Sequence, residues 1–197
     1  MKAFLLLLGC LLSSAVLAGP RVELVTSHGK LQLELDEQAA PLTVANFLRY
    51  VDDGSYNNSL FHRLIPGFVV QGGGYDTDYA PLPSYGPIEN ESDNGLSNRA
   101  GTIAMARTQD PHSATRQFYI NLSDNLSLDG GRSPGYTVFG RVTAGQEALT
   151  RMAGVPTGMN MQLRARDVPD EPIVLLEVRR LGEQAEGPMA QEPVSKP

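Results

Sequence analysis

Residues 61–73 read Phe61-His62-Arg63-Leu64-Ile65-Pro66-Gly67-Phe68-Val69-Val70-Gln71-Gly72-Gly73. The stretch places a permanent cation, Arg63, a few residues before an aromatic ring, Phe68, and an amide, Gln71. The apolar residues around them favour two short strands, and Pro66-Gly67 favours a turn between the strands. The stretch therefore predicts a compact β unit that carries one cation and one amide beside an apolar surface.

A β-hairpin and a helix are predicted in the part of the chain before this stretch. Alternating apolar and polar residues predict a β-hairpin over 22–36 with its turn at 27–30. A helix is expected to begin at Pro41 and to end at Gly54, because proline suits a first helical turn and glycine a C-terminal cap. Its buried stripe is predicted to be Val44, Phe47, Leu48 and Val51.

Further short strands and one more helix are predicted downstream. The strands are expected at 60–63, 67–71, 101–107, 117–121, 139–142 and 173–180, and the helix at 146–152. Long loops rich in Gly, Pro, Asn and Ser separate them at 75–99 and 124–136. The pattern favours a mostly β fold, a closed antiparallel barrel with its ends plugged by two helices.

The 61–73 stretch resembles the signature of the cyclophilins, the cyclosporin-binding class of peptidyl-prolyl cis-trans isomerases. The resemblance extends from about residue 22 to residue 181. It implies an eight-stranded antiparallel barrel with two capping helices, activity on Xaa-Pro peptide bonds, and no cofactor or metal.

The chemistry of this reaction requires few groups. Rotation about an amide bond meets a barrier of about 18–20 kcal/mol, because conjugation between carbon and nitrogen must be broken. The twisted prolyl nitrogen regains a lone pair, so a fixed cationic donor stabilises the transition state selectively. Arg63 is the candidate donor, and Gln71 is similar to the family's glutamine that holds the arginine; the simpler alternatives are a surface ion pair and a satisfied strand end.

The resemblance also implies a proline pocket. Phe68 corresponds to the family's pocket phenylalanine, Val69 stands where eukaryotic members commonly have methionine, and Tyr119 takes the place of a second phenylalanine. Leu128 matches a pocket leucine. By default, apolar residues on strands are core residues, and Phe118 and Ile120 are expected to be only that.

Four more positions complete the predicted substrate groove. Met105-Ala106-Arg107 resembles the family's Met-Ala-Asn motif, in which Ala106 and Arg107 pair with the substrate backbone, and Gln117 is similar to a supporting glutamine. Tyr136 takes the place of a histidine found in eukaryotic members. Ser127 lies where cyclosporin-sensitive members have tryptophan, so we expect weak cyclosporin binding.

Size and charge restrict the other possibilities. The chain has 197 residues and a formal net charge of −6, which fits a single domain and argues against nucleic acid as a partner. None of the three histidines has zinc-ligand spacing to another. A monomer is expected.

Residues 1–18 combine Lys2, an apolar run and a small-residue site ending at Ala18, as in a secretory signal peptide. A membrane anchor and a lipoprotein site at Cys10 are the alternatives, and the apolar run is short for a spanning helix. We therefore expect a periplasmic protein, without membrane attachment after cleavage, with an isomerase domain over 19–181. Residues 182–197, acidic and rich in proline, are expected to form a disordered tail.

The sequence thus predicts an isomerase that acts on unfolded or proline-containing polypeptides among exported proteins and assists their folding. The alternative is a proline-peptide binding module or chaperone with incidental isomerase activity. Arg63 favours the enzyme, because binding a planar proline needs only the pocket.

Overall fold

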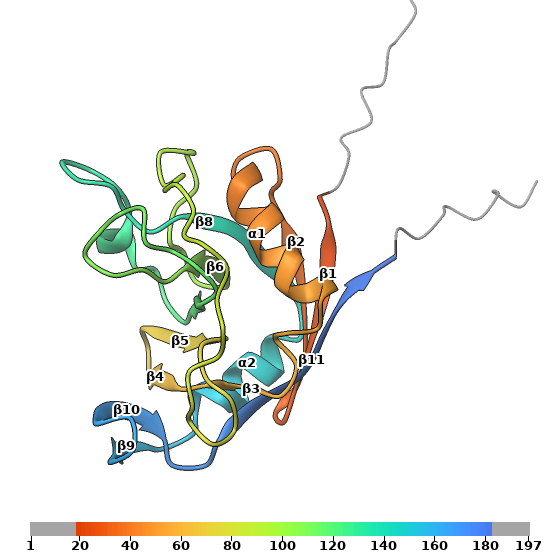
Figure 1. Ribbon diagram of the computed structural model, residues 1–197, viewed down its shortest axis with the longest axis vertical. Helices are drawn as coiled ribbons and strands as arrows, with labels where there is room; N and C mark the ends of the chain where they lie inside the picture. Colours follow the sequence, from red (N-terminus) through yellow and green to blue (C-terminus); the bar gives the residue numbers. More distant parts are fainter. Residues whose placement is uncertain (1–18, 183–197) are drawn as a thin grey trace, which may run out of the picture.

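The computed structural model describes residues 19–182. In this part of the chain, nine strands form one antiparallel sheet in the order β3-β11-β1-β2-β8-β6-β7-β5-β4, and β9 and β10 form a separate hairpin (Figure 1). The predicted signal peptide, 1–18, and all of the predicted tail except Gly182 lie outside the described residues. No helix within 19–182 is long and apolar enough to cross a membrane.

The bounds of the elements are as follows. The sheet strands are β1 Arg21–Thr26, β2 Gly29–Leu35, β3 Ser59–Phe61, β4 Arg63–Ile65, β5 Val69–Gly72, β6 Thr102–Met105, β7 Phe118–Asn121, β8 Val138–Ala144 and β11 Ile173–Leu181. The hairpin consists of β9 Thr157–Asn160 and β10 Ala165–Pro169. The helices are α1 Pro41–Asp52, the 3-10 turn η1 Leu126–Leu128, and α2 Gln146–Ala153.

The two ends of the sheet order meet at one residue. Only His62 separates β3 from β4, and β3 pairs with β11 while β4 pairs with β5. The predicted strand over 60–63 is therefore part of one bent segment, residues 59–65, that changes partners at His62; Leu64 and Ile65 lie beyond the predicted bounds. Counting its halves separately gives nine strands instead of the expected eight, and the bend nearly closes the barrel.

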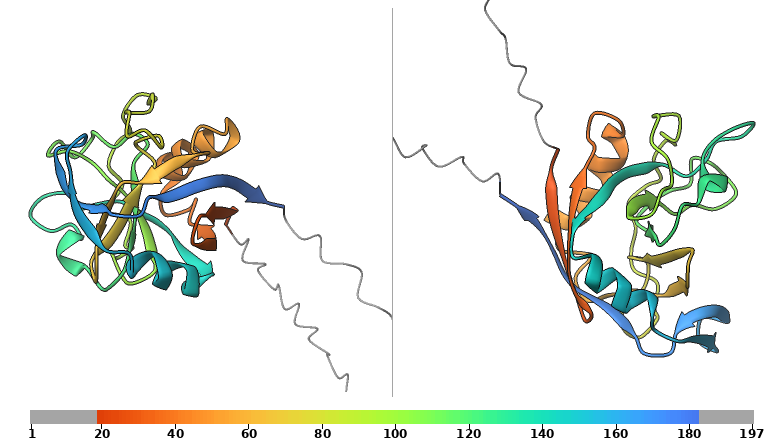
Figure 2. Two further views of the ribbon diagram at one scale, coloured as in Figure 1. Left: turned by 90° about the horizontal axis from the view of Figure 1, so that it is seen from below. Right: turned by 180° about the vertical axis from the view of Figure 1, so that it is seen from behind.

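The interior of the barrel follows the predicted alternation. Leu24 and Leu33 are fully buried on β1 and β2, and they share one apolar cluster with Phe47 of α1 and Met152 of α2. Figures 1 and 2 show α1 toward one end of the barrel and α2 toward the other. Helices that contribute apolar side chains to this interior close the ends of the barrel, as the sequence predicts.

Helix α1 begins and ends as expected, but a distant loop completes its first turn. Pro41 is the first helical residue and Gly54 follows the C-terminal cap with a φ of +71°. Ala40, at the N-cap, provides no side-chain acceptor. The carboxylate of Glu91 instead accepts hydrogen bonds from the backbone N–H groups of Leu42 (3.0 Å) and Thr43 (2.8 Å). The loop after β5 is thereby attached to the helix.

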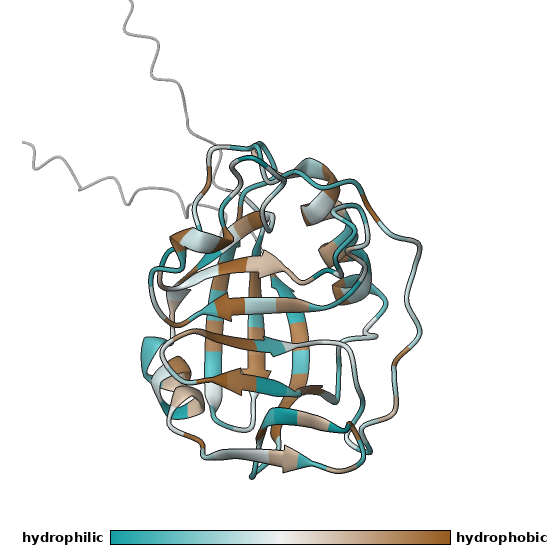
Figure 3. Ribbon diagram, turned by 90° about the vertical axis from the view of Figure 1, so that its left-hand side faces the viewer, coloured by the Kyte–Doolittle hydropathy of each residue, from teal (hydrophilic) through white to brown (hydrophobic). Residues whose placement is uncertain are grey.

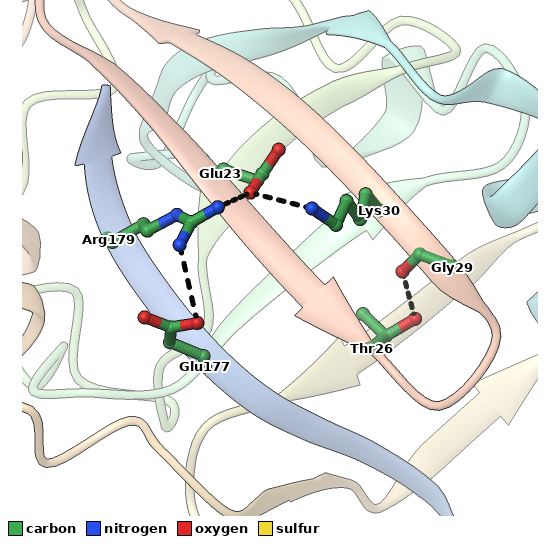
Figure 4. Close-up of polar contacts among 6 residues, drawn as sticks. All are labelled: Glu23, Thr26, Gly29, Lys30, Glu177 and Arg179. Atoms are coloured by element: carbon green, nitrogen blue, oxygen red, sulfur yellow. Dashed lines mark hydrogen bonds and ion pairs between the residues drawn. The ribbon is translucent and has the colours of Figure 1, made fainter. Parts of the chain in front are cut away.

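A polar cluster joins the three strands β11, β1 and β2. The Glu23 carboxylate on β1 accepts hydrogen bonds from Arg179 Nη2 of β11 at 2.6 Å and Lys30 Nζ of β2 at 3.4 Å (Figure 4). Burial raises the pKa of Glu23, but the hydrogen bonds and charges of Arg179 and Lys30 outweigh it, and the pKa lies below its ordinary value. Oppositely charged neighbours across strands stabilise the pairing.

The sequence pattern did not predict the hairpin β9–β10, nor the short turn η1 inside the predicted loop 124–136. The turn of the hairpin places Arg164 and its bulge places Asp167 at positive φ, +50° and +61°, and the register shifts between Ala165 and Val168. Such irregular geometry at residues other than glycine interrupts the alternation on which strand prediction depends. The hairpin packs β10 against β4, the strand that begins with Arg63.

Candidate active site

One row of paired residues crosses five strands and carries much of the predicted site. Arg63 of β4 pairs with Gln71 of β5, Gln71 with Tyr119 of β7, Tyr119 with Ala104 of β6, and Ala104 with Val138 of β8. Directly paired residues in a sheet place their side chains side by side on the same face. The row therefore runs from a cation to apolar side chains on one face of the sheet; Figure 3 shows the ribbon from the side on which β4 and β5 lie in Figure 1.

At the polar end of the row, three side chains form a chain of hydrogen bonds. Arg63 Nη1 donates to Gln71 Oε1 at 3.3 Å, and Gln71 Nε2 donates to Gln117 Oε1 at 2.9 Å. The ion pairs within residues 19–182 do not include Arg63. A guanidinium has five N–H donors, so most of those on Arg63 stay available to a ligand.

The position of Gln117 depends on an adjacent glycine and on the start of β7. A Cβ on Gly74 would lie 2.5 Å from Gln117 Nε2 and 2.6 Å from its Cδ, so the amide packs directly against the glycine backbone. The Gln117 carbonyl accepts a hydrogen bond from the N–H of Ala106 at 2.9 Å. This contact holds the predicted substrate-binding residue Ala106 beside the chain of amides.

The apolar end of the row is a second cluster, separate from the barrel core. Its buried members are Val69, Ala104, Tyr119 and Val138, and the partly buried residues packed against them are Phe68, Leu96, Ala106, Leu128 and Tyr136. We call this set the apolar pocket, because it contains the residues of the predicted proline pocket. We call its buried members, each 4% exposed or less, the floor. We call the partly buried members the rim, since these side chains stay accessible to a ligand.

Arg107 lies at this rim, but its side chain is engaged by the protein. Its three guanidinium nitrogens donate to the carbonyls of Gly135 (3.2 Å), Pro134 (2.8 Å) and Thr108 (2.9 Å). The same group lies 4.4 Å from the centre of the Tyr136 ring. Arg107 therefore supports Tyr136 and the loop before it, since cations over aromatic faces attract.

The hydroxyl of Tyr119 points away from the rim. It donates to Asn98 Oδ1 at 2.8 Å, which satisfies the buried hydroxyl as a tyrosine at this position requires. Burial, together with the neighbouring Tyr136 and Asp129, raises the pKa of Tyr119, so the ring stays neutral. The pocket is therefore lined by the tyrosine ring, without its polar atom.

The structure brings nine of the ten sequence-predicted site residues together in these two groups, and the tenth, Arg107, lies over the ring of Tyr136 at the rim. Ser127 lies exposed on η1, next to Leu128. Four further residues of the site were not predicted from the sequence: Ala104, Val138, Leu96 and Asn98. For Ala104, the alternation with Ala106 along one strand was an available signal; the other three depend on loop paths and cross-strand pairing.

The role of Arg116 was not predicted from the sequence either. This side chain is 2% exposed and donates to the carbonyls of Gly73, Pro83 and Ser55. Burial lowers the pKa of its guanidinium, although the nearby tyrosines oppose the effect. Arg116 thereby anchors the glycine run after Gln71 to the segment that carries Gln117.

This arrangement can hold a small apolar ring beside a fixed cation. A group bound on the Tyr119 ring would lie one strand away from Gln71 and two from Arg63 along the row. Neighbouring strands lie about 5 Å apart. The free N–H donors of Arg63 could therefore reach an acceptor at the edge of the bound ring.

Comparison with known proteins gives consistent matches over nearly the whole described chain. A family model described as cyclophilin type peptidyl-prolyl cis-trans isomerase/CLD matches residues 21–180. Peptidyl-prolyl cis-trans isomerase cyp18 of Streptomyces antibioticus is 48% identical over 165 residues, covering 82% of this chain and 98% of that protein. Peptidyl-prolyl cis-trans isomerase A of Dickeya dadantii is 47% identical over 162 residues, covering 82% and 84%.

A solved structure has the same fold. The crystal structure of a Cryptosporidium parvum cyclophilin type peptidyl-prolyl cis-trans isomerase in the presence of the dipeptide Ala-Pro aligns with a TM-score of 0.69 at 26% identity. The alignment covers 82% of this chain and 99% of that one.

Proposed function

The chain belongs to the cyclophilin-type peptidyl-prolyl cis-trans isomerases, and we propose that Arg63 is the group that catalyses the isomerisation while the apolar pocket binds the proline ring. The observation that carries this proposal is the position of Arg63. It lies on the same row as the pocket floor, it is held by Gln71, and it has no ion-pair partner among residues 19–182.

The proposed mechanism needs no bond to be made or cleaved. The rim residues hold the proline ring, and the backbone at Ala106 and Arg107 pairs with the substrate chain. As the peptide bond twists, the prolyl nitrogen becomes pyramidal and accepts a hydrogen bond from Arg63. Because this contact exists only in the twisted state, it lowers the barrier instead of only strengthening binding. Gln71 and Gln117 keep the guanidinium in place, so little reorganisation is needed during the reaction.

The test measures cis-trans exchange of a short Ala-Pro peptide by NMR with the wild type and the variant Arg63→Ala. We expect the kcat of the variant to fall about a hundredfold while the variant still binds the peptide. This is the usual effect of removing one hydrogen-bond donor that stabilises a transition state in an enzyme. Arg141→Ala is the matched control, because it removes a surface arginine paired with Glu34. Equal kcat values for Arg63→Ala and the wild type would remove Arg63 from the mechanism.

We further propose that the substrates are Xaa-Pro bonds in unfolded or loop segments of exported proteins, in a periplasmic compartment. The support is the sequence of residues 1–18, which has the features of a cleaved signal peptide. Uncatalysed proline isomerisation takes tens of seconds or more and can limit folding, so the enzyme would assist it. Fractionation of cells that express the full chain, followed by mass determination of the mature N-terminus, tests both the compartment and cleavage after Ala18.

Cyclosporin binding is proposed to be weak. Ser127 stands where the resemblance places tryptophan, and a serine lacks both the large ring and the indole donor. Titration of cyclosporin against isomerase activity tests this, and inhibition at nanomolar concentrations contradicts it. The same assay addresses the alternative of a binding module, because a wild type that binds Ala-Pro peptides without accelerating exchange would have the pocket but not the activity.

A further inference from the structure

Three buried asparagines lie directly behind the apolar pocket, and we call them the asparagine network. They are Asn98, Asn121 and Asn125, and their exposed fractions are 0%, 0% and 7%. Asn121 Nδ2 donates to Asn98 Oδ1 at 3.1 Å, and Asn125 Nδ2 donates to Asn121 Oδ1 at 2.7 Å. With so little exposure, none of the three is able to contact a substrate in the groove.

Asn98 connects the floor of the pocket to its rim. Its Oδ1 accepts the hydroxyl of Tyr119, and its Nδ2 donates to Asp129 Oδ1 at 2.8 Å and to the carbonyl of Tyr136 at 3.4 Å. Its backbone N–H also donates to Asp129, at 2.7 Å. Although burial raises the pKa of Asp129, the hydrogen bonds from Asn98 and Ser97 keep it below its ordinary value. A carboxylate thus fixes the orientation of the Asn98 amide.

Asn125 connects the asparagine network to two other rim residues, Phe68 and Leu128. Its Nδ2 donates to the carbonyl of Phe68 at 2.8 Å, and its carbonyl accepts the N–H of Leu128 at 2.8 Å. Its own N–H donates to the carbonyl of Asn98 at 2.7 Å. Four members of the apolar pocket are therefore hydrogen-bonded to Asn98 or Asn125: Tyr119 and Tyr136 to the side chain of Asn98, Phe68 to the side chain of Asn125, and Leu128 to the backbone of Asn125.

We infer that the asparagine network positions the apolar pocket, with Asn98 and Asn125 as positioning residues that set the affinity for proline substrates. The inference rests on the proposed role of the pocket. Ordering mobile side chains during association costs free energy. Rim residues that are already fixed before the substrate binds avoid this cost. Because buried polar networks act as a unit, loss of one member loosens the others.

The network is expected to affect binding more than the chemical step. The side-chain hydrogen bonds of Arg63 and Gln71 run to each other and to Gln117, and none of them joins the asparagine network. Asn98→Ser shortens the side chain so that it reaches neither Tyr119 nor Tyr136. We expect the Kd for an Ala-Pro dipeptide and the KM for a proline peptide to rise about fivefold, the effect of one lost net hydrogen bond. The kcat should stay within about twofold of the wild type.

Asn46→Ser is the matched control. Asn46 is also buried and donates through Nδ2 to a backbone carbonyl, that of Thr115, but it lies on α1 and outside the pocket. It should lower the melting temperature without changing Kd or KM. If Asn98→Ser leaves Kd and KM at the values of Asn46→Ser, or if it lowers kcat by as much as it raises KM, the positioning role is wrong.

Two further variants keep the inference testable if Asn98→Ser does not fold. Asn125→Ser removes the hydrogen bond to the Phe68 carbonyl, and Tyr119→Phe removes only the hydroxyl that donates a hydrogen bond to Asn98. Each is expected to raise Kd about threefold to fivefold. Adding Asn125→Ser to Tyr119→Phe should give less than the product of the two effects. Unchanged Kd in both single variants, or full multiplication of the effects, overturns the inference.

Failure of the proposed function would be recognisable separately. Dipeptide Kd is measured without any turnover, so it reports on the pocket even if the protein did not accelerate exchange. Arg63→Ala should lower kcat by the same factor in the wild-type and Asn125→Ser backgrounds. A factor that changes between backgrounds would mean that the network acts on the arginine, and this also overturns the inference.

Discussion

The Gly74 backbone and the Gln117 amide show how a missing side chain can position a functional one. The glycine has no left-handed φ, so its conformation is open to any residue; only the contact with Gln117 excludes a Cβ. Gly74→Ala should therefore push the amide away, break its hydrogen bond with Gln71 and loosen Arg63. We expect kcat/KM for a proline peptide to fall about tenfold, since small misplacements at an active site are costly.

Gly86→Ala provides the control for this substitution. Gly86 also lacks a left-handed φ, and nothing lies within 4 Å of a Cβ built there. Its kcat/KM should equal that of the wild type. If Gly74→Ala behaves in the same way, the chain of amides is not required to hold Arg63.

Arg107 yields a second prediction for a single residue. Lysine at this position keeps the charge but lacks the planar fork with which arginine donates to the Pro134 and Gly135 carbonyls from two fixed nitrogens. Arg107→Lys should therefore loosen Tyr136 and raise KM about threefold, one net hydrogen bond or less. Arg132→Lys, an exposed substitution in the neighbouring loop, should leave KM unchanged. An unchanged KM in Arg107→Lys would show that Tyr136 is held by other contacts.

At the scale of single residues, the sequence predicts site residues where the information is local. Arg63, Phe68 and Gln71 stand within nine residues of one another, so one stretch could identify them. Asn98 and its partner Tyr119 are 21 positions apart and meet only after β7 and the loop before β6 are in place. A buried asparagine in a polar loop has no distinguishing pattern, which is why the network could not be predicted.

At the scale of elements, α1 obtains part of its stability from a loop 48 residues away. Glu91 satisfies two of the N–H groups that every helix leaves without intrahelical partners, and it also accepts the Thr43 hydroxyl at 2.7 Å. Glu91→Ala should lower the free energy of unfolding by about 1–2 kcal/mol, as for the loss of a capping side chain. Urea unfolding followed by circular dichroism measures this value.

Glu89→Ala is the matched control for the cap. Glu89 is an exposed carboxylate two residues earlier in the same loop. Its substitution should change the free energy of unfolding by less than about 0.5 kcal/mol, as for ordinary surface positions. Equal effects of the two variants would mean that the loss of charge, and not the loss of the cap, destabilises the protein.

The elements also show where periodicity is informative. The predicted hairpin and α1 were confirmed, because the buried faces of β2 and α1 repeat at the strand and helix periods over seven and twelve residues. The strand over 60–63 was predicted as one piece, and the pattern could not reveal a change of partner inside it. The loop 75–99 is pinned by Glu91 and by Tyr85, whose backbone N–H donates to the Tyr50 hydroxyl at 2.8 Å, contacts without local signals.

At the scale of the whole molecule, the residue that matters most is His62, which separates β3 from β4 where the two ends of the sheet meet. The ring is 8% exposed, lies 4.7 Å from the Tyr75 ring between centres, and its Nδ1 has no hydrogen-bond partner within the described residues. Burial, with a smaller contribution from the charge of Arg63, lowers the pKa of His62 from 6.5 to about 4. Protonation would therefore place an uncompensated charge at the seam between the two ends of the sheet.

This pKa shift makes the stability of the barrel depend on pH. His62 binds a proton near pH 6.5 in the unfolded chain but only near pH 4 in the folded one, so acid favours unfolding. The stabilisation is complete above pH 6.5 and is lost as the pH falls toward 4. Between pH 7 and pH 5, the free energy of unfolding should fall by about 2 kcal/mol. Urea unfolding at several pH values measures this slope.

The variant His62→Phe separates this effect from that of the carboxylates. Phenylalanine keeps a planar ring against Tyr75 and does not titrate. The shifted carboxylates, such as those of Glu23 and Asp52, have pKa values below the ordinary ones, so their contribution is lost mainly below pH 4.5. His62→Phe should therefore show a flat free energy of unfolding between pH 7 and pH 5. If His62→Phe kept the wild-type dependence of the free energy of unfolding on pH, the acid sensitivity would come from groups other than His62.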